Sequence, residues 1–314
     1  MFTAFLDWIP LSFVNSTNII QILCSLILER NIRAGAAECL LVLVDRKFKA
    51  EERDFILPLF LYLDFFLQAL NEKVAGDITE EVNYSFQKRV CQILVDVGTA
   101  VLLSKTSTIP ENFPKYLDIL LIFYAHPSHM LSSFVVPFWL ACFKAPLIAE
   151  TQAFQQIFPT LLQTSCAKLL KVGEPDKSNS PSCKFSLEDF ETVYEFRKFF
   201  SVYRSRTLEV VKHLAEFKPV ETMEFICRSL EDFVRNVYRT GQKLTVHDEV
   251  YIIWEARSTI IENVFTSLTK KSLETPLGVP ALFCFSFFFL ISDPIIYIFF
   301  LSLSLWISFS SLPS

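Results

Sequence analysis

The chain has little glycine, only 6 of its 314 residues. Turn-rich all-β folds and phosphate-binding loops both need glycine for backbone conformations that other residues reach only with strain. The motifs GxGxxG, GxxxxGK[ST], GxSxG and HExxH do not occur in the sequence. We therefore expect no nucleotide-binding loop, cofactor, catalytic metal or enzymatic activity.

Excess positive charge is also lacking, since the formal net charge is −5. A nucleic-acid partner would therefore need a local basic surface on an acidic protein. The eight cysteines are scattered without a CxxC pair, which predicts buried free thiols in a reducing compartment. The first residues have no basic segment before their apolar stretch, so they do not resemble a secretory signal. They look like the middle of a helical segment, and we expect the natural folded unit to begin before Met1.

Apolar residues are abundant and recur at the i, i+3, i+4 and i+7 spacing of amphipathic helices. No window of strict apolar and polar alternation competes with this pattern, so we predict an all-α fold. The expected helical blocks are 18–31, 33–47, 52–72, 79–104, 112–125, 128–144, 150–171, 186–200, 205–216, 221–238 and 247–269.

These blocks come in pairs that recur about every 40 residues, a period typical of HEAT or armadillo solenoids. The segment NIRAGAAECLLVLVDRK (31–47) resembles the second helix of such a pair. Its small residues Ala34, Ala36 and Ala37 would allow close helix approach, and Leu40, Leu41, Leu43 and Val44 would form the buried stripe. An ordinary globular helix bundle is the alternative.

Two polar features invite a functional interpretation. His126 and His129 in HPSHM have a spacing that could hold a metal, but no nearby Cys, Asp or Glu completes a site, so we favour a loop or N-cap role. In SLEDFETVYE, Ser186 and Asp189 fit a helix capping box, which makes the carboxylates there structural.

One basic cluster, EFRKFFSVYRSRTLEVVKHL, interleaves cations with aromatic residues. Such a surface could contact RNA phosphates without reading bases. The alternative is a solvated helix face with snorkelling side chains. The candidate RNA contacts are Arg197, Lys198, Arg204, Arg206 and Lys212.

Several short strings in order, among them AGAAECLLVLVDRKFK, FQKRVCQIL, YLDILLIFYAHPSHMLSS and LLKVGEPDKSNSPSCKFSLEDF, resemble the central HEAT repeats of the exportin-5 family of karyopherin-β receptors. The likeness covers roughly residues 3–272. It implies a HEAT solenoid that binds hairpin or double-stranded RNA such as precursor microRNA together with Ran-GTP. The receptor would shuttle between nucleus and cytoplasm and catalyse no reaction. The family's N-terminal Ran-binding arch has no counterpart in this chain, so the resemblance assigns Ran to no residue here.

Two other functions stay open at this point. A karyopherin or HEAT scaffold that binds only proteins would share the helical rhythm. A tail-anchored membrane protein would use the apolar run near the C-terminus, although Asp293 and Pro294 interrupt that run.

The segment 276–314 differs in composition from the preceding residues. Phe, Ser, Leu and Pro make up 26 of the 38 residues from Leu277 to Ser314, and neither Lys nor Arg follows Lys271. Pyrimidine-rich DNA encodes those four residues. We therefore interpret residues 1–275 as the HEAT repeats and 276–314 as translated intron or another gene-model artefact, without a membrane partner.

Overall fold

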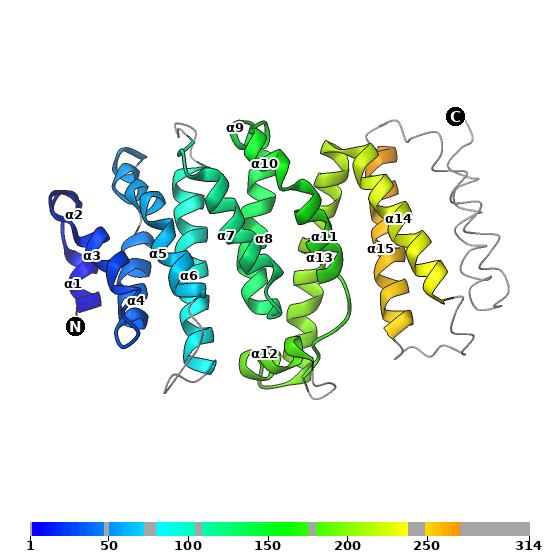
Figure 1. Cartoon of the computed structure of the whole chain (residues 1–314), viewed down its shortest axis with the longest axis horizontal. Coiled ribbons are helices and arrows are strands. Elements are labelled where there is room, and N and C mark those ends of the chain that lie inside the picture. Colours follow the sequence, from blue (N-terminus) through cyan, green and yellow to red (C-terminus); the bar gives the residue numbers. More distant parts are fainter. Residues whose placement is uncertain are drawn as a thin grey trace. The chain divides into compact units, whose positions relative to one another are not determined.

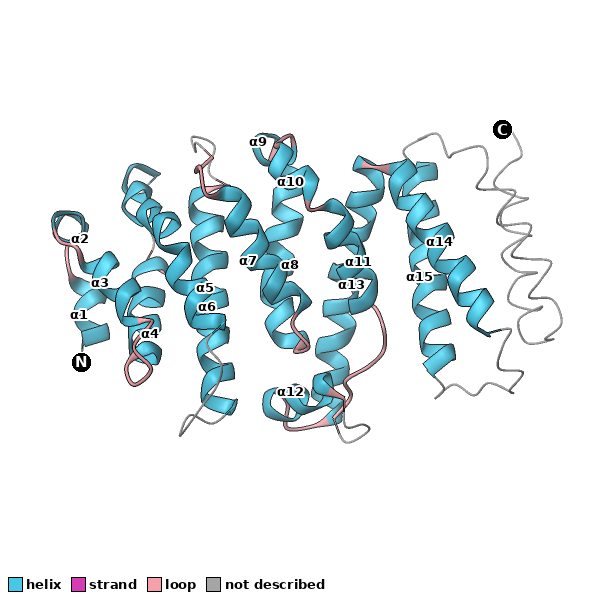
Figure 2. Ribbon diagram, viewed as in Figure 1, coloured by secondary structure: helices cyan, strands magenta, loops and turns pink. Residues whose placement is uncertain are grey.

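The structure, a computed structural model, describes residues 2–46, 50–71, 80–103, 109–175, 180–237 and 249–270. The described residues contain helices and loops and no strand (Figure 2). They form an all-α helical-repeat solenoid, so the predicted fold class is confirmed. The chain divides into two compact units, residues 1–210 and 211–314, and the boundary lies inside one long helix.

The first unit contains most of the helices (Figure 1). In chain order they are α1 (Phe2–Trp8), α2 (Leu11–Ser16), α3 (Ile19–Leu26), α4 (Arg33–Val44), the 3₁₀ helix η1 (Ala50–Tyr62), α5 (Leu63–Asn71), α6 (Glu80–Val101), α7 (Phe113–Ala125), α8 (His129–Lys144), α9 (Pro146–Ala149), α10 (Gln152–Gln156), α11 (Phe158–Lys168), α12 (Pro181–Asp189) and α13 (Val193–Phe217).

Two layers of helices build this unit. In one layer α4 packs on α6 and α6 on α8, and in the other α3 packs on α5 and α5 on α7 (Figure 1). Within pairs, α3 contacts α4 and α7 contacts α8. Each pair is thus covered by the next, as in a HEAT solenoid, because a single pair cannot bury both of its apolar faces.

The predicted stripe of 31–47 is largely correct. Leu40, Leu43 and Val44 are buried in α4, whereas Leu41 is only half-buried. Ala36 and Ala37 are buried where α4 meets its neighbours. The described cysteines are free thiols, and all but Cys166 are buried.

Two expected helices are divided next to prolines, and one expected break is absent. The block 52–72 is a 3₁₀ helix containing Pro58 and then α5, because proline removes a helical hydrogen bond. The block 150–171 divides into α10 and α11, with Pro159 in the first turn of α11. The break expected at 201–204 does not exist, and α13 runs through it.

The second unit contains the end of α13, α14 (Pro219–Val237) and α15 (Glu249–Lys270). α14 packs against α15, where Phe233 stacks on Trp254 at 5.8 Å between ring centroids. Ser267 in α15 donates a hydrogen bond of 2.7 Å to Glu216 at the end of α13. These contacts make the unit a three-part helical cluster.

The predicted artefact at 276–314 lies outside the described residues and stays a prediction. Among the helices of the described ranges, none is long and apolar enough to cross a lipid bilayer.

Side chains of α7 and α8 pack directly against Gly98 in α6. Tyr116 of α7 donates a hydrogen bond of 2.7 Å to the Leu94 carbonyl, one turn before this glycine. A Cβ atom on Gly98 would lie 1.9 Å from the Tyr116 hydroxyl oxygen and 2.8 Å from a ring carbon of Phe138. Glycine is therefore required here by packing, not by backbone conformation.

We predict that Gly98→Ala destabilises the protein by about 1–3 kcal/mol or more, because the buried tyrosine must move and lose its hydrogen bond. Gly35→Ala is the matched control, since no atom lies within 4 Å of a Cβ at that helical position. It should stabilise by about 0.5–1 kcal/mol. Urea unfolding followed by circular dichroism measures both, and equal effects of the two substitutions would contradict this packing argument.

Candidate functional site

The site is built on the junction between α12 and α13. Ser180 caps α12 by accepting a hydrogen bond from the Cys183 amide, and that helix ends where Phe190 is extended. α13 then begins with a reciprocal capping box, in which the Thr192 hydroxyl accepts from the Glu195 amide and the Glu195 carboxylate accepts from the Thr192 amide. The predicted capping box at Ser186 and Asp189 is therefore wrong. Ser186 is buried inside α12 and donates to the Ser182 carbonyl.

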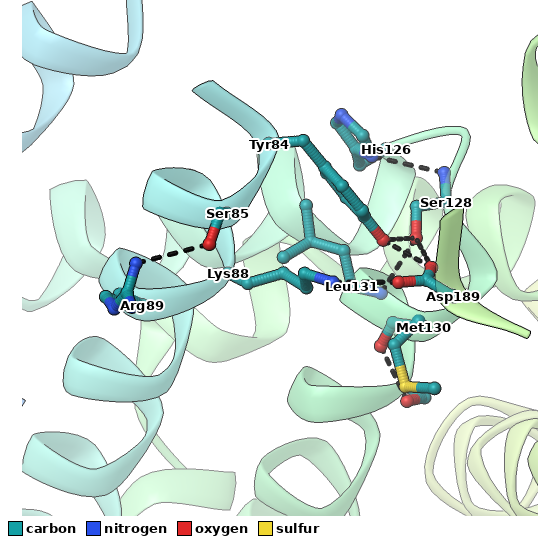
Figure 3. Close-up of polar contacts among 10 residues, drawn as sticks. Tyr84, Ser85, Lys88, Arg89, His126, Ser128, Met130, Leu131 and Asp189 are labelled. Atoms are coloured by element: carbon teal, nitrogen blue, oxygen red, sulfur yellow. Dashed lines mark hydrogen bonds and ion pairs between the residues drawn. The ribbon is translucent and has the colours of Figure 1, made fainter. Parts of the chain in front are cut away.

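Asp189 instead anchors the junction to two other helices (Figure 3). Its carboxylate accepts hydrogen bonds of 2.5 Å from the Tyr84 hydroxyl and 2.8 Å from the Lys88 ammonium, both on α6. Ser128, the N-cap of α8, lies 2.6 Å from the same Tyr84 hydroxyl. One carboxylate therefore connects α6, α8 and the end of α12.

This network lies in a poorly solvated place, because the Asp189 side chain is only 3% exposed. Burial, followed by the hydrogen bond to Asp189, raises the pKa of Tyr84 above its ordinary range, so the phenol stays a donor. The Lys88 ammonium also lies over the Tyr84 ring at 4.3 Å from its centroid. The buried charge is thus paired and hydrogen-bonded, as such a charge must be.

Next to this anchor is a groove of about 700 Å³ between α8 and α13. Apolar and aromatic side chains form its floor: Val136, Phe190, Phe199, Val202 and Tyr203. Carboxylates occur toward the start of α13 and cations further along that helix. The polar lining residues are Ser133, Asp189, Glu191, Glu195, Lys198 and Arg206.

Within the first unit, the structure separates the candidate RNA contacts into two pairs. Lys198 and Arg206 are exposed and line the groove. Arg197 pairs with Glu174 at 2.5 Å, and Arg204 donates to the Leu169 carbonyl at 2.9 Å, so both support the loop after α11. Lys212 lies in the second unit.

The histidines of HPSHM lie at the turn from α7 to α8, so the loop role is correct for His126, whereas the N-cap of α8 is Ser128 and His129 is the first helical residue. His126 follows the last turn of α7 and accepts from the Ser128 amide, while His129 begins α8 and contacts the Val172 carbonyl at 3.0 Å. Burial, then the nearby Lys168 charge, lowers the pKa of each imidazole to about 4, so both are neutral at pH 7. Within the described ranges, no group of three or more His, Cys, Asp or Glu residues could hold a metal ion.

Lys168 is the buried cation of this turn. It lies in α11 and donates to the His126 carbonyl. Burial lowers the pKa of its ammonium from near 10.5 to about 8. The group is therefore charged at pH 7 at a cost to folding.

Comparison with known proteins identifies this arrangement of helices. A family model described as the exportin-5 family matches residues 81–281, which include the Asp189 anchor and the groove. The chain belongs to the exportin-5 family. Similar relatives are the exportin-5 proteins of Homo sapiens (32% identical over 287 residues, 85% of this chain), Mus musculus (30% over 303 residues, 88%) and Dictyostelium discoideum (29% over 277 residues, 87%).

The chain spans about a quarter of the length of these curated relatives, 24% of the human protein and 25% of the mouse protein. The groove and its anchor are thus features of one section of an exportin-5 family solenoid. Sequence reasoning named Lys198 and Arg206 through the basic cluster, gave Asp189 only a local capping role and missed Tyr84 and Lys88. Their partners are 101 or more residues apart in the chain, so no local pattern marks them.

We predict that Asp189→Asn destabilises the protein by about 2 kcal/mol, because it removes the charge from the buried acceptor that the Tyr84 hydroxyl and the half-buried Lys88 ammonium share. Asp64→Asn is the control, since it breaks the solvent-exposed pair with Lys115. That change should cost less than about 1 kcal/mol. Chemical unfolding measures both variants, and similar losses for the two would show that the buried network does not anchor the junction.

A second prediction concerns pH. The unfolded state binds the Lys168 proton more tightly than the folded state, so this group makes stability rise as pH increases from about 8 toward 10.5. Lys168→Met removes the burial cost of the charge. Its stability relative to the unmodified protein should therefore be highest at pH 7 and fall by about 3 kcal/mol by pH 10.5.

Unfolding curves recorded at several pH values test this difference. The Lys184→Met variant serves as the control, because it removes an exposed lysine of the same unit. A difference for Lys168→Met that stays constant with pH would mean that the buried ammonium is not destabilised.

Proposed function

We propose that this chain is a section of a nuclear export receptor that carries hairpin or double-stranded RNA, such as precursor microRNA, from nucleus to cytoplasm together with Ran-GTP. The observation that carries the proposal is the match to the exportin-5 family model over residues 81–281. The stacked helix pairs of the first unit agree with it, because repeated pairs give an extended binding surface. The role is transport by binding, without catalysis.

RNA of many sequences is best held by shape and phosphate contacts, which need exposed cations rather than base-reading side chains. Of the five candidate contacts, Arg197 and Arg204 are engaged with the loop after α11. Lys198 and Arg206 are exposed on α13 and are the candidates that we carry forward in the first unit. Lys212 stays a separate prediction in the second unit.

We expect the double variant Lys198→Glu and Arg206→Glu to bind a labelled RNA hairpin more weakly than the unmodified chain. If both cations contact phosphates, the slope of log affinity against log salt should become shallower by about 2. Fluorescence anisotropy over a salt series, with and without Ran-GTP, makes the measurement. Lys144→Glu with Lys184→Glu is the matched control, because both lysines are exposed in the same unit and the net charge changes equally.

Four outcomes are informative. Loss of affinity and slope in the first variant alone supports phosphate contacts at α13. Equal losses in both variants would indicate only the general charge of the protein. Unchanged binding in both would remove these two cations from the RNA surface, and absence of hairpin binding by the unmodified chain would remove RNA binding from this section.

A further inference from the structure

We propose that the groove between α8 and α13 binds a short protein segment that has apolar side chains in its middle, basic residues at one end and acidic residues at the other. The proposal goes beyond RNA transport and does not depend on it. It rests on the lining of the groove and on the order of charges along it.

The two ends of the groove carry charges of opposite sign, and Lys198, one turn after Glu195, lies between them. Glu191 and Glu195 are exposed at the beginning of α13, and Arg206 is exposed eleven residues after Glu195. At a rise of 1.5 Å per residue this separation is about 16 Å, which an extended segment of about five residues spans. A segment with the reversed order of charges complements both ends.

The floor between these charges is apolar and partly uncovered. Val202 is 55% exposed, whereas Val136 and Tyr203 of the same lining are buried. Phe199 stacks on Tyr203 at 5.8 Å and lies 5.0 Å from Phe190, giving a rigid aromatic surface. The volume of about 700 Å³ is suited to a few side chains.

The carboxylates of the groove disfavour nucleic acid as its occupant. Glu191 and Glu195 are exposed at the groove edge, and both repel phosphate. A protein segment can instead offer basic side chains to these carboxylates.

The Asp189 network holds the groove together, and its ion pair does not involve the exposed charges of α13. Its carboxylate lines the groove but is already paired with Lys88 and Tyr84. Glu195, although its carboxylate caps α13, remains exposed at the groove edge. The charges that a bound segment meets are therefore those of Glu191, Glu195, Lys198 and Arg206.

The experiment uses fluorescein-labelled heptapeptides with Phe at the centre. One has two lysines before and two glutamates after it, one has the reverse order, and one has lysines at both ends. We expect the unmodified chain to bind one of the first two saturably in fluorescence anisotropy and to prefer it to the all-lysine peptide. Absence of saturable binding by both mixed-charge peptides overturns the proposal.

Variants then locate the bound peptide. Val202→Asp should weaken binding at least about tenfold, because it places a charge on the apolar floor. Val220→Asp is the matched control at a similarly exposed valine of α14, 49% exposed, and should change the affinity less than twofold. Lys198→Glu with Arg206→Glu should reverse the preference in favour of the all-lysine peptide. Equal effects of the two valine substitutions would place the peptide elsewhere.

The RNA hairpin is titrated against the same proteins. If Val202→Asp weakens the hairpin and no peptide binds, the groove is an RNA site and the present proposal is wrong. If a mixed-charge peptide binds and responds to Val202→Asp while the hairpin does not bind at all, the groove assignment stands and the RNA part of the proposed function fails.

Discussion

Every helix pair in the first unit depends on its neighbours to cover its apolar faces. The buried side chains of α6, such as Val90, Leu94 and Val97, are enclosed by helices on both sides, since α6 packs against α4 and α8. No pair could keep these surfaces out of water alone. This need for mutual cover explains why small residues lie where neighbouring helices pack closely. The plainest case is Gly98, where the Tyr116 hydroxyl occupies the space that a Cβ atom would need.

Apolar stacking alone does not determine how α12 and α13 are oriented on the layer before them. The polar network of Asp189 supplies that information, because its hydrogen bonds to Tyr84 and Lys88 require particular positions of the helix ends. Buried charges of this kind contribute more to a unique arrangement than to total stability. In this protein the arrangement they select opens the groove between α8 and α13.

The spacing of apolar residues in the sequence was sufficient to predict the all-α solenoid and most helix positions. The buried face of each helix is visible in its own stretch of sequence. Helix ends were harder to predict from the sequence. The SLEDFETVYE stretch contains two possible capping boxes, Ser186 with Asp189 and Thr192 with Glu195, and only tertiary contacts decide between them. The basic cluster was visible as composition, yet Arg197 and Arg204 turned out to hold a loop, since their partners Glu174 and Leu169 are distant in the chain.

This division of the cations has a consequence for how the solenoid section binds partners. Two arginines of α13 are used to build the protein, and two cations remain beside an aromatic floor with carboxylates at its other end. The capping of α13 accounts for Glu195, but a surface made for phosphate alone would gain from removing Glu191, because its carboxylate repels a nucleic-acid backbone. Its presence beside the exposed Val202 therefore favours a partner with both charges and apolar side chains, which is the chemistry of a protein segment.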